Sequence, residues 1–127
     1  MILDASALIA GIGDSRAESR LRGGDIAAPD LIVPEVLNAI WKLARRGFSV
    51  PDRATVLGLL DKIRVLPSLP YAARAAEIAD EFDHPVYDCL YLALAEAQGD
   101  VLLTADARLS RKLGKTRLRK RIRLVAG

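Results

Sequence analysis

The chain has 127 residues and a net charge of +3, with 51% hydrophobic and 28% charged residues, which predicts one globular domain over residues 1–127 that needs no disulfide or structural metal. Its single cysteine, Cys89, excludes an intramolecular disulfide, and we expect it to be buried and inert in a reducing cytoplasm. Because no apolar stretch is long enough to cross a bilayer and no signal peptide opens the chain, we expect a soluble, cytoplasmic protein.

Short apolar runs alternate with helical patterns, which predicts βα units wound into a central parallel sheet flanked by helices. The expected elements are, in order, a strand at 2–4, a short helix from 6 to 11 or 13, a second short helix and loop up to 24, a strand at 26–28, a helix at 29–46, a helix at 51–63, a strand at 65–66, a helix at 70–82, a helix at 85–98, a strand at 101–103, a short basic helix after 106 and a strand at 122–125. This alternation indicates an α/β fold.

Two of the expected helices carry features that bear on packing. The helix at 85–98 is apolar on nearly every face, so we expect it to pack centrally against the sheet and to hold Asp88 in a mostly buried setting. Trp41 lies beside an apolar face of the helix at 29–46, and we expect it to pack in the core or at a dimer interface.

Four acidic residues stand where an apolar segment ends or a helix is expected to begin, namely Asp4, Glu35, Asp88 and Asp106. Taken singly, each has an ordinary role as a helix cap or as a partner of the helix dipole. In an open parallel sheet, however, the reactive edge lies just past the C-terminal ends of the strands, so the four are expected to share one site. A total charge of about −4 in a partly buried space raises pKa values unless cations bind.

Carboxylate oxygens suit Mg²⁺ or Mn²⁺, and one histidine with one cysteine is too few for a typical zinc site, so the sequence predicts an acid-only metal site. Such an ion favours hydrolysis of a phosphodiester. Ser6, Asn38 and Thr104 lie close to the acids in sequence, and each is expected to orient a carboxylate or a metal-bound water. The alternative for Ser6 and Thr104 is a cap or local turn, and the alternative for Asn38 is a solvated side chain. The lone His84 is expected to be a cap or loop residue outside the site.

The basic residues are concentrated at one end of the chain. All 16 acidic residues lie at or before Asp106, and nine basic residues follow it without an acidic one. This block predicts attraction to a phosphate backbone, with a solvated helix and edge strand as the alternative. Arg108, Arg111 and Lys112 lie at helical spacings just past Asp106, and we expect them to contact RNA.

Four local strings carry a family resemblance: Ile2-Leu3-Asp4-Ala5-Ser6-Ala7-Leu8, Pro34-Glu35-Val36-Leu37-Asn38, Val86-Tyr87-Asp88-Cys89-Leu90-Tyr91-Leu92-Ala93-Leu94-Ala95 and Leu102-Leu103-Thr104-Ala105-Asp106. In this order and at these separations they resemble the PIN-domain nucleases, and more narrowly the VapC-type ribonuclease toxins of toxin–antitoxin pairs. The resemblance implies a PIN-like three-layer fold and an Mg²⁺- or Mn²⁺-dependent endoribonuclease. Its catalytic metal ligands, direct or through water, are Asp4, Glu35, Asp88 and Asp106.

The resemblance also implies partners. An antitoxin protein is expected to inhibit the enzyme by placing a peptide in a hydrophobic groove near Trp41, and a homodimer is expected. Many PIN relatives carry a further acid in the helix after the third position or beside the fourth. Tyr91, Leu92 and Ala107 stand there in this chain, which leaves the choice between one and two metal ions open.

Other functions were weighed against this one. A PIN-domain ribonuclease of RNA processing, outside any toxin pair, fits the same residues. A phosphatase of the haloacid dehalogenase type needs a second aspartate two residues after the first, where this chain has Ser6. A non-hydrolytic nucleotide-binding or receiver-like α/β module needs paired acids at the first strand and a late lysine, and neither is suitably placed. The target RNA and the identity of the antitoxin stay open.

Overall fold

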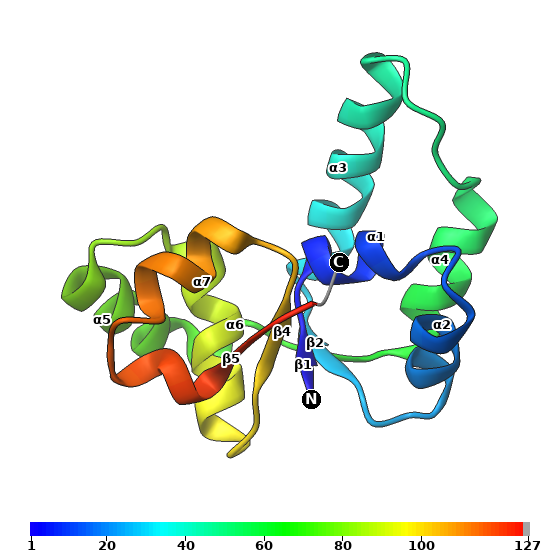
Figure 1. The fold of residues 1–127 in the computed structure, drawn as a ribbon. Coiled ribbons are helices and arrows are strands. Elements are labelled where there is room, and N and C mark those ends of the chain that lie inside the picture. Colours follow the sequence, from blue (N-terminus) through cyan, green and yellow to red (C-terminus); the bar gives the residue numbers. More distant parts are fainter. Residues whose placement is uncertain (126–127) are drawn as a thin grey trace.

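A five-stranded parallel sheet forms the centre of the protein in the computed structural model, which describes residues 1–125 (Figure 1). The strand order is β3-β2-β1-β4-β5, with β1 at Ile2–Leu3, β2 at Ala27–Pro29, β3 at Arg64–Leu66, β4 at Leu102–Thr104 and β5 at Ile122–Leu124. The chain adds β2 and β3 on one side of β1 and then returns to add β4 and β5 on the other. The direction of winding therefore reverses between β1 and β4, where open α/β sheets bind their ligands.

Helices cover both faces of the sheet, so the predicted three-layer α/β fold is confirmed. The helices are α1 (Ala5–Gly11), α2 (Ser15–Arg22), α3 (Ile32–Arg45), α4 (Arg53–Lys62), α5 (Ala72–Phe82), α6 (Val86–Ala97) and α7 (Ala107–Leu113), with 3₁₀ turns η1 (Leu69–Tyr71) and η2 (Arg117–Arg121). In Figure 1, α5, α6 and α7 lie on one side of the sheet and α1 to α4 on the other. Of the helices within residues 1–125, none has the length and apolar character needed to cross a bilayer.

Helix α6 is the central packing element, as its composition predicts. It lies against β1, β2 and β4, and its residues from Tyr91 to Ala95 are all buried. A parallel sheet that is covered on both faces needs apolar residues on both sides of its strands, and β1 and β2 are buried throughout. Cys89 is fully buried, and burial raises the pKa of its thiol to about 11, so it is inert at neutral pH.

Two expected helix boundaries were wrong for local reasons. Residue 29 does not open α3, because Pro29 is the last residue of β2 and the amide of Asp30 donates to the carbonyl of Leu66 at 2.8 Å. This hydrogen bond keeps the chain extended until the turn before Ile32. The helix expected from residue 70 begins instead as the 3₁₀ turn η1, with proline in its first positions, and becomes α-helical only at Ala72.

Of the two expected placements of Trp41, packing in the core of the chain was wrong, and packing at a dimer interface stays a prediction. Helix α3 projects beyond the sheet, so its C-terminal half lacks a strand to cover it (Figure 1). Trp41 is 55% exposed, and the guanidinium group of Arg45 lies 5.1 Å from the centre of its ring. Leu37 and Phe48 are also exposed along this arm. The apolar face of α3 is therefore only partly used by the core.

The packing of α6 predicts the effect of two matched substitutions. Leu94 in α6 is fully buried, whereas Leu57 in α4 is 45% exposed. We expect Leu94→Ala to lower the free energy of unfolding by about 2–5 kcal/mol, because it removes buried methyl groups and leaves a cavity. Leu57→Ala should change it by less than about 1 kcal/mol. Urea unfolding of both variants measures the difference, and equal losses would contradict the central place of α6.

Candidate active site

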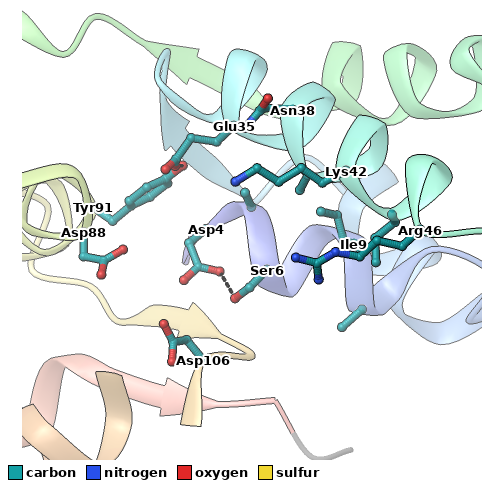
Figure 2. Close-up of a pocket in the computed structure, with 14 residues that line it drawn as sticks. Asp4, Ser6, Ile9, Glu35, Asn38, Lys42, Arg46, Asp88, Tyr91 and Asp106 are labelled. Carbon is teal, nitrogen blue, oxygen red and sulfur yellow. Dashed lines mark hydrogen bonds between the residues drawn. The ribbon is translucent and has the colours of Figure 1, made fainter. Parts of the chain in front are cut away.

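One pocket of about 610 Å³ collects all four acidic residues that the sequence singled out (Figure 2). Asp4, Glu35, Asp88 and Asp106 line it, although 102 positions separate the first from the last. Two of them follow strands and two lie in the first turns of helices. The pocket lies at the C-terminal edge of the sheet, beside the point where the winding reverses.

The register of β1 and β4 brings Asp4 and Asp106 to this edge. Leu3 pairs with Leu103 in the parallel ladder, and the amide of Asp4 donates to the carbonyl of Leu103 at 3.2 Å. Each aspartate then caps the helix that follows, since Asp4 is the N-cap of α1 and Asp106 the N-cap of α7. Capping fixes the direction of both side chains.

Glu35 and Asp88 enter the pocket from the first turns of α3 and α6. The free amides of a first helical turn carry partial positive charge, which favours a carboxylate there. The side chain of Asp88 is 32% exposed, so most of its surface is covered, as expected, although it is more open than Asp4. The N-terminal turn of α6 reaches the open side of the pocket, and only the rest of the helix is covered.

Asp4 is the most enclosed of the four carboxylates, with 6% exposure. Its Oδ1 accepts hydrogen bonds from the hydroxyl of Ser6 at 2.7 Å and from the amide of Ala7 at 2.9 Å. The same Ser6 oxygen accepts from the amide of Ala105 at 2.9 Å. Ser6 therefore joins the loop after β1 to the loop after β4 and contacts the Asp4 carboxylate directly.

Thr104 and Asn38, the other two residues expected to support the acids, differ in their contacts. Thr104 is fully buried, and its hydroxyl accepts from the amide of Asp106 at 3.0 Å. A hydrogen bond from the same hydroxyl also acts to lower the pKa of Asp4, so Thr104 bears on both residues. Asn38 lines the pocket and is exposed. Among the hydrogen bonds of residues 1–125 described by the structure, none involves its side chain.

Burial and mutual repulsion oppose full ionisation of the acids when no cation is bound. Burial raises the pKa of Asp4, and the negative charge of Asp88 adds to the shift. Burial likewise raises the pKa of Glu35, and the charges of Asp88 and Asp4 raise it further. The hydroxyl of Tyr91 donates to Oε1 of Glu35 at 2.5 Å and partly offsets this rise. A bound cation would remove the repulsion, as would protonation.

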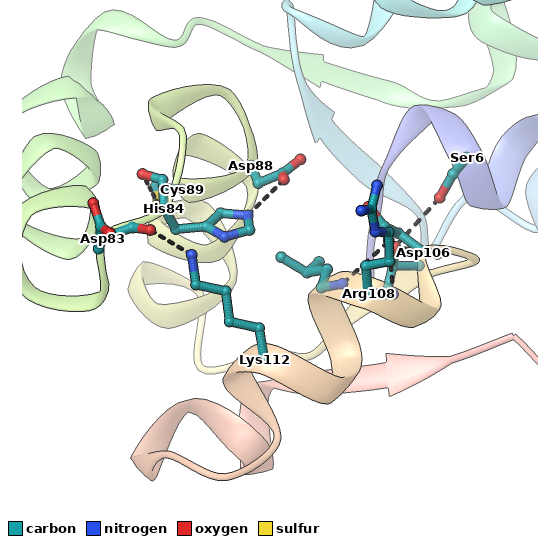
Figure 3. Close-up of polar contacts among 10 residues, drawn as sticks. Ser6, Asp83, His84, Asp88, Cys89, Asp106, Arg108 and Lys112 are labelled. Carbon is teal, nitrogen blue, oxygen red and sulfur yellow. Dashed lines mark hydrogen bonds and ion pairs between the residues drawn. The ribbon is translucent and has the colours of Figure 1, made fainter.

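Two residues that the sequence analysis left outside the site contact its acids. Tyr91 is buried in α6 and donates the hydrogen bond to Glu35. Burial raises the pKa of the Tyr91 hydroxyl. His84 lies just before α6, and its Nε2 is 2.7 Å from Oδ2 of Asp88 (Figure 3). It is a loop residue, as expected, but its side chain is only 10% exposed and contacts one of the acids of the site. His84 and Asp88 are four residues apart on either side of the start of a helix, and this spacing could have indicated their contact from the sequence.

Two basic residues that the sequence did not single out line the pocket. Lys42 and Arg46 of the α3 segment line it, whereas Arg108, Arg111 and Lys112 do not. The three expected residues are exposed on α7, and Lys112 donates to the backbone carbonyl of Asp83, beside the loop that carries His84 (Figure 3). The basic helix therefore lies next to the pocket rather than in its wall.

The chemistry of the donors fits a hard divalent cation that keeps part of its water. Within residues 1–125, no three histidine, cysteine or acidic side chains lie close enough to hold an ion directly. The acids nevertheless share one pocket, offer only oxygen atoms and repel one another. Mg²⁺ commonly binds through one or two carboxylates with water in the other positions, which is compatible with this spacing.

The raised pKa values in the pocket predict a pH-dependent gain of stability in one variant. Because the pKa of Asp4 lies above its ordinary value of 3.8, its proton stabilises the fold at low pH, and this contribution is lost as the pH rises through the raised pKa. Asn keeps the oxygen that accepts from Ser6 and Ala7 and carries no charge. We expect Asp4→Asn to raise the Tm of the metal-free protein at neutral pH, and the gain to disappear below pH 3.8.

Asp52 supplies a matched control for this measurement. It caps α4, is exposed, and accepts from the amide of Thr55, which lowers its pKa. The stabilising contribution of such a group is present above its ordinary pKa, so Asp52→Asn should leave the Tm unchanged or lower it at neutral pH. If Asp4→Asn lowers the Tm of the metal-free protein at neutral pH, the assignment of a raised pKa to Asp4 is wrong.

Comparison with known proteins agrees with this geometry. The family model of the PIN domain matches residues 1–114. Ribonuclease VapC3 of Pyrobaculum aerophilum is 34% identical over 122 residues, covering 88% of this chain and 93% of the relative. Ribonuclease VapC12 of Mycobacterium tuberculosis is 32% identical over 125 residues, covering 90% and 92%.

Solved structures show the same fold. The crystal structure of PAE2754 from Pyrobaculum aerophilum superposes with a TM-score of 0.73 at 32% identity and covers 87% of this chain and 77% of its own. A toxin–antitoxin complex from Klebsiella pneumoniae has a chain with a TM-score of 0.60 at 17% identity, covering 84% and 87%, which shows the fold alone. The resemblance found in the sequence is confirmed, and the chain belongs to the PIN-domain family as a VapC-type member.

Proposed function

We propose that this protein is an endoribonuclease that uses Mg²⁺ or Mn²⁺ held by the acidic pocket to hydrolyse RNA. The convergence of Asp4, Glu35, Asp88 and Asp106 on one pocket carries the proposal. The names of the relatives from Pyrobaculum aerophilum and Mycobacterium tuberculosis, both called ribonucleases, support RNA as the substrate. RNA is met in the cytoplasm, where we propose that the protein acts.

The four carboxylates are the proposed metal ligands, direct or through water. Asp4 and Asp106 are fixed by helix capping, and Glu35 and Asp88 approach from the first turns of α3 and α6. A bound divalent cation would lower the pKa of water and offset the charge that develops on the phosphodiester. Whether one ion or two bind is left to experiment, because Tyr91 occupies a position where many relatives carry a further acid.

The neighbouring side chains are proposed to hold the acids in place. Ser6 fixes the Asp4 carboxylate through its hydroxyl, and Tyr91 and His84 donate towards Glu35 and Asp88. Groups of this kind orient metal ligands, and their removal commonly costs activity about 10- to 100-fold. Arg108, Arg111 and Lys112 stay proposed contacts for RNA beyond the pocket.

Cleavage of RNA tests the catalytic assignment. We expect Asp4→Asn, Asp88→Asn and Asp106→Asn each to lower the rate by more than about 100-fold, the upper range for loss of a supporting group. Circular dichroism should show that the three variants keep their fold. EDTA should stop the wild-type reaction and added Mn²⁺ should restore it. Asp61→Asn, which changes an exposed residue of α4, serves as the control with wild-type rate.

Two results would contradict this assignment. Wild-type rates in the three pocket variants would remove the carboxylates from the reaction. Intact RNA with the wild-type protein and Mn²⁺, together with binding of free nucleotides, would favour a non-hydrolytic nucleotide-binding module.

We further propose that the nuclease is the toxin of a toxin–antitoxin pair and forms a homodimer. The VapC-type relatives and the fold shared with a chain of a toxin–antitoxin complex support this reading. The exposed side chains of Leu37, Trp41 and Phe48 give the arm formed by α3 and the turn after it an apolar surface, as an antitoxin segment requires. A basic side chain of that segment would pair with the acids.

Growth experiments separate a toxin from a nuclease of RNA processing. We expect expression of the wild-type protein to arrest growth, and expression of Asp4→Asn at the same level to leave growth normal. Co-expression of the small protein encoded next to this gene should relieve the arrest, and the two proteins should purify together without Mn²⁺-dependent cleavage. If the wild-type protein leaves growth unaffected and no small protein purifies with it, the toxin reading fails and RNA processing becomes the better function.

A further inference from the structure

A row of polar side chains runs along one face of α3 from the acids towards the tip of the arm. Glu35, Asn38, Lys42 and Arg46 follow one another at spacings of three, four and four residues, which places them on the same side of the helix. All four line the acidic pocket. Figure 2 shows the amino group of Lys42 and the guanidinium group of Arg46 on the same side of α3 as Asp4 and Ser6.

These two cations have no acidic partner in the part of the chain that the structure describes. The ion pairs of residues 1–125 join other groups, and neither Lys42 nor Arg46 lies within 4.0 Å of a carboxylate oxygen. Both are exposed. Seven residues of helix, about 10 Å along the axis, separate Lys42 from Glu35. The pocket therefore has an acidic end and a basic end, and the basic end is free to bind an anion.

Helix-dipole compensation does not explain this arrangement. Basic residues in a last helical turn are favoured wherever they point, because the free carbonyls there carry partial negative charge. Arg45 satisfies the same condition while stacking on Trp41, and it does not line the pocket. Lys42 and Arg46 instead face the acids, and helical side chains lean towards the N-terminus, which brings their charged ends closer to the reaction site.

We propose that Lys42 and Arg46 form a phosphate-binding subsite that holds the backbone of single-stranded RNA beside the acidic end of the pocket. The proposal rests on the proposed ribonuclease function and adds the direction in which the strand runs, along α3 towards the tip of the arm. Lysine and arginine bind phosphate oxygens without reading the base, so the subsite positions RNA and does not select its sequence. One helical turn, about 5 Å, separates the two cations, which suits neighbouring phosphates of an extended strand.

A double substitution tests the subsite. In Lys42→Gln with Arg46→Gln, the KM for a short single-stranded RNA of random sequence should rise about 10-fold, since two charged contacts are lost. Binding of the same RNA, measured by fluorescence anisotropy on an Asp4→Asn background with Mg²⁺, should weaken similarly. The slope of log affinity against log salt concentration should become shallower by about 1.4, or about 0.7 for each lost contact.

Two further variants serve as controls. Arg22→Gln with Lys62→Gln removes the same charge from exposed positions at the ends of α2 and α4, away from the pocket, and should keep the wild-type KM and salt slope. Lys42→Arg with Arg46→Lys retains both charges and should restore most of the affinity. This pair of results separates a local phosphate contact from the effect of net charge.

The outcomes for the subsite and for the nuclease are distinguishable. If the wild-type protein cleaves RNA and the Lys42/Arg46 double variant has an unchanged KM and salt slope, the subsite is absent and the nuclease stands. If the double variant and the Arg22/Lys62 control weaken binding equally, the effect is general and the subsite is again overturned. If the wild-type protein fails to cleave RNA with Mn²⁺, the nuclease proposal fails, while the anisotropy measurement still decides whether the two cations bind the strand.

Discussion

Repulsion among carboxylates in a pocket sheltered from water is the constraint on which the site depends. Burial and the neighbouring charges raise the pKa values of Asp4 and Glu35, so the acids resist full ionisation unless a cation binds. The fold holds the acids together with hydrogen-bond donors, including the hydroxyls of Ser6 and Tyr91. Without a cation, the clustered carboxylates destabilise the folded protein. A cation that binds the folded pocket removes this penalty and so stabilises the fold.

The parallel sheet makes this concentration of charge feasible. Strands β1 and β4 end side by side, and the loops after them carry Asp4 and Asp106 at the point where the winding reverses. Both aspartates also cap helices, so each contributes to local stability as well as to the site. Helix α6 is buried along most of its length yet exposes its first turn, which allows Asp88 to reach the pocket while the rest of the helix forms the core.

The sequence predicts the features that depend on local pattern. Strand ends followed by acids place Asp4 and Asp106 at the sheet edge, and the apolar composition of α6 places it against the strands. Features that depend on tertiary placement were not predicted. The contact of His84 with Asp88 depends on how the chain enters α6, and the exposure of Trp41 depends on how far α3 extends beyond the sheet.

Anomalous diffraction from crystals grown with Mn²⁺ tests the central claim most directly, because it locates the ion itself. We expect a peak in the acidic pocket, bound directly or through water by Asp4, Glu35, Asp88 and Asp106, and a weaker peak or none in crystals of Asp4→Asn. If the protein cleaves RNA with Mn²⁺ but its crystals show no anomalous peak in this pocket at saturating Mn²⁺, the assignment of the metal site to these acids is contradicted.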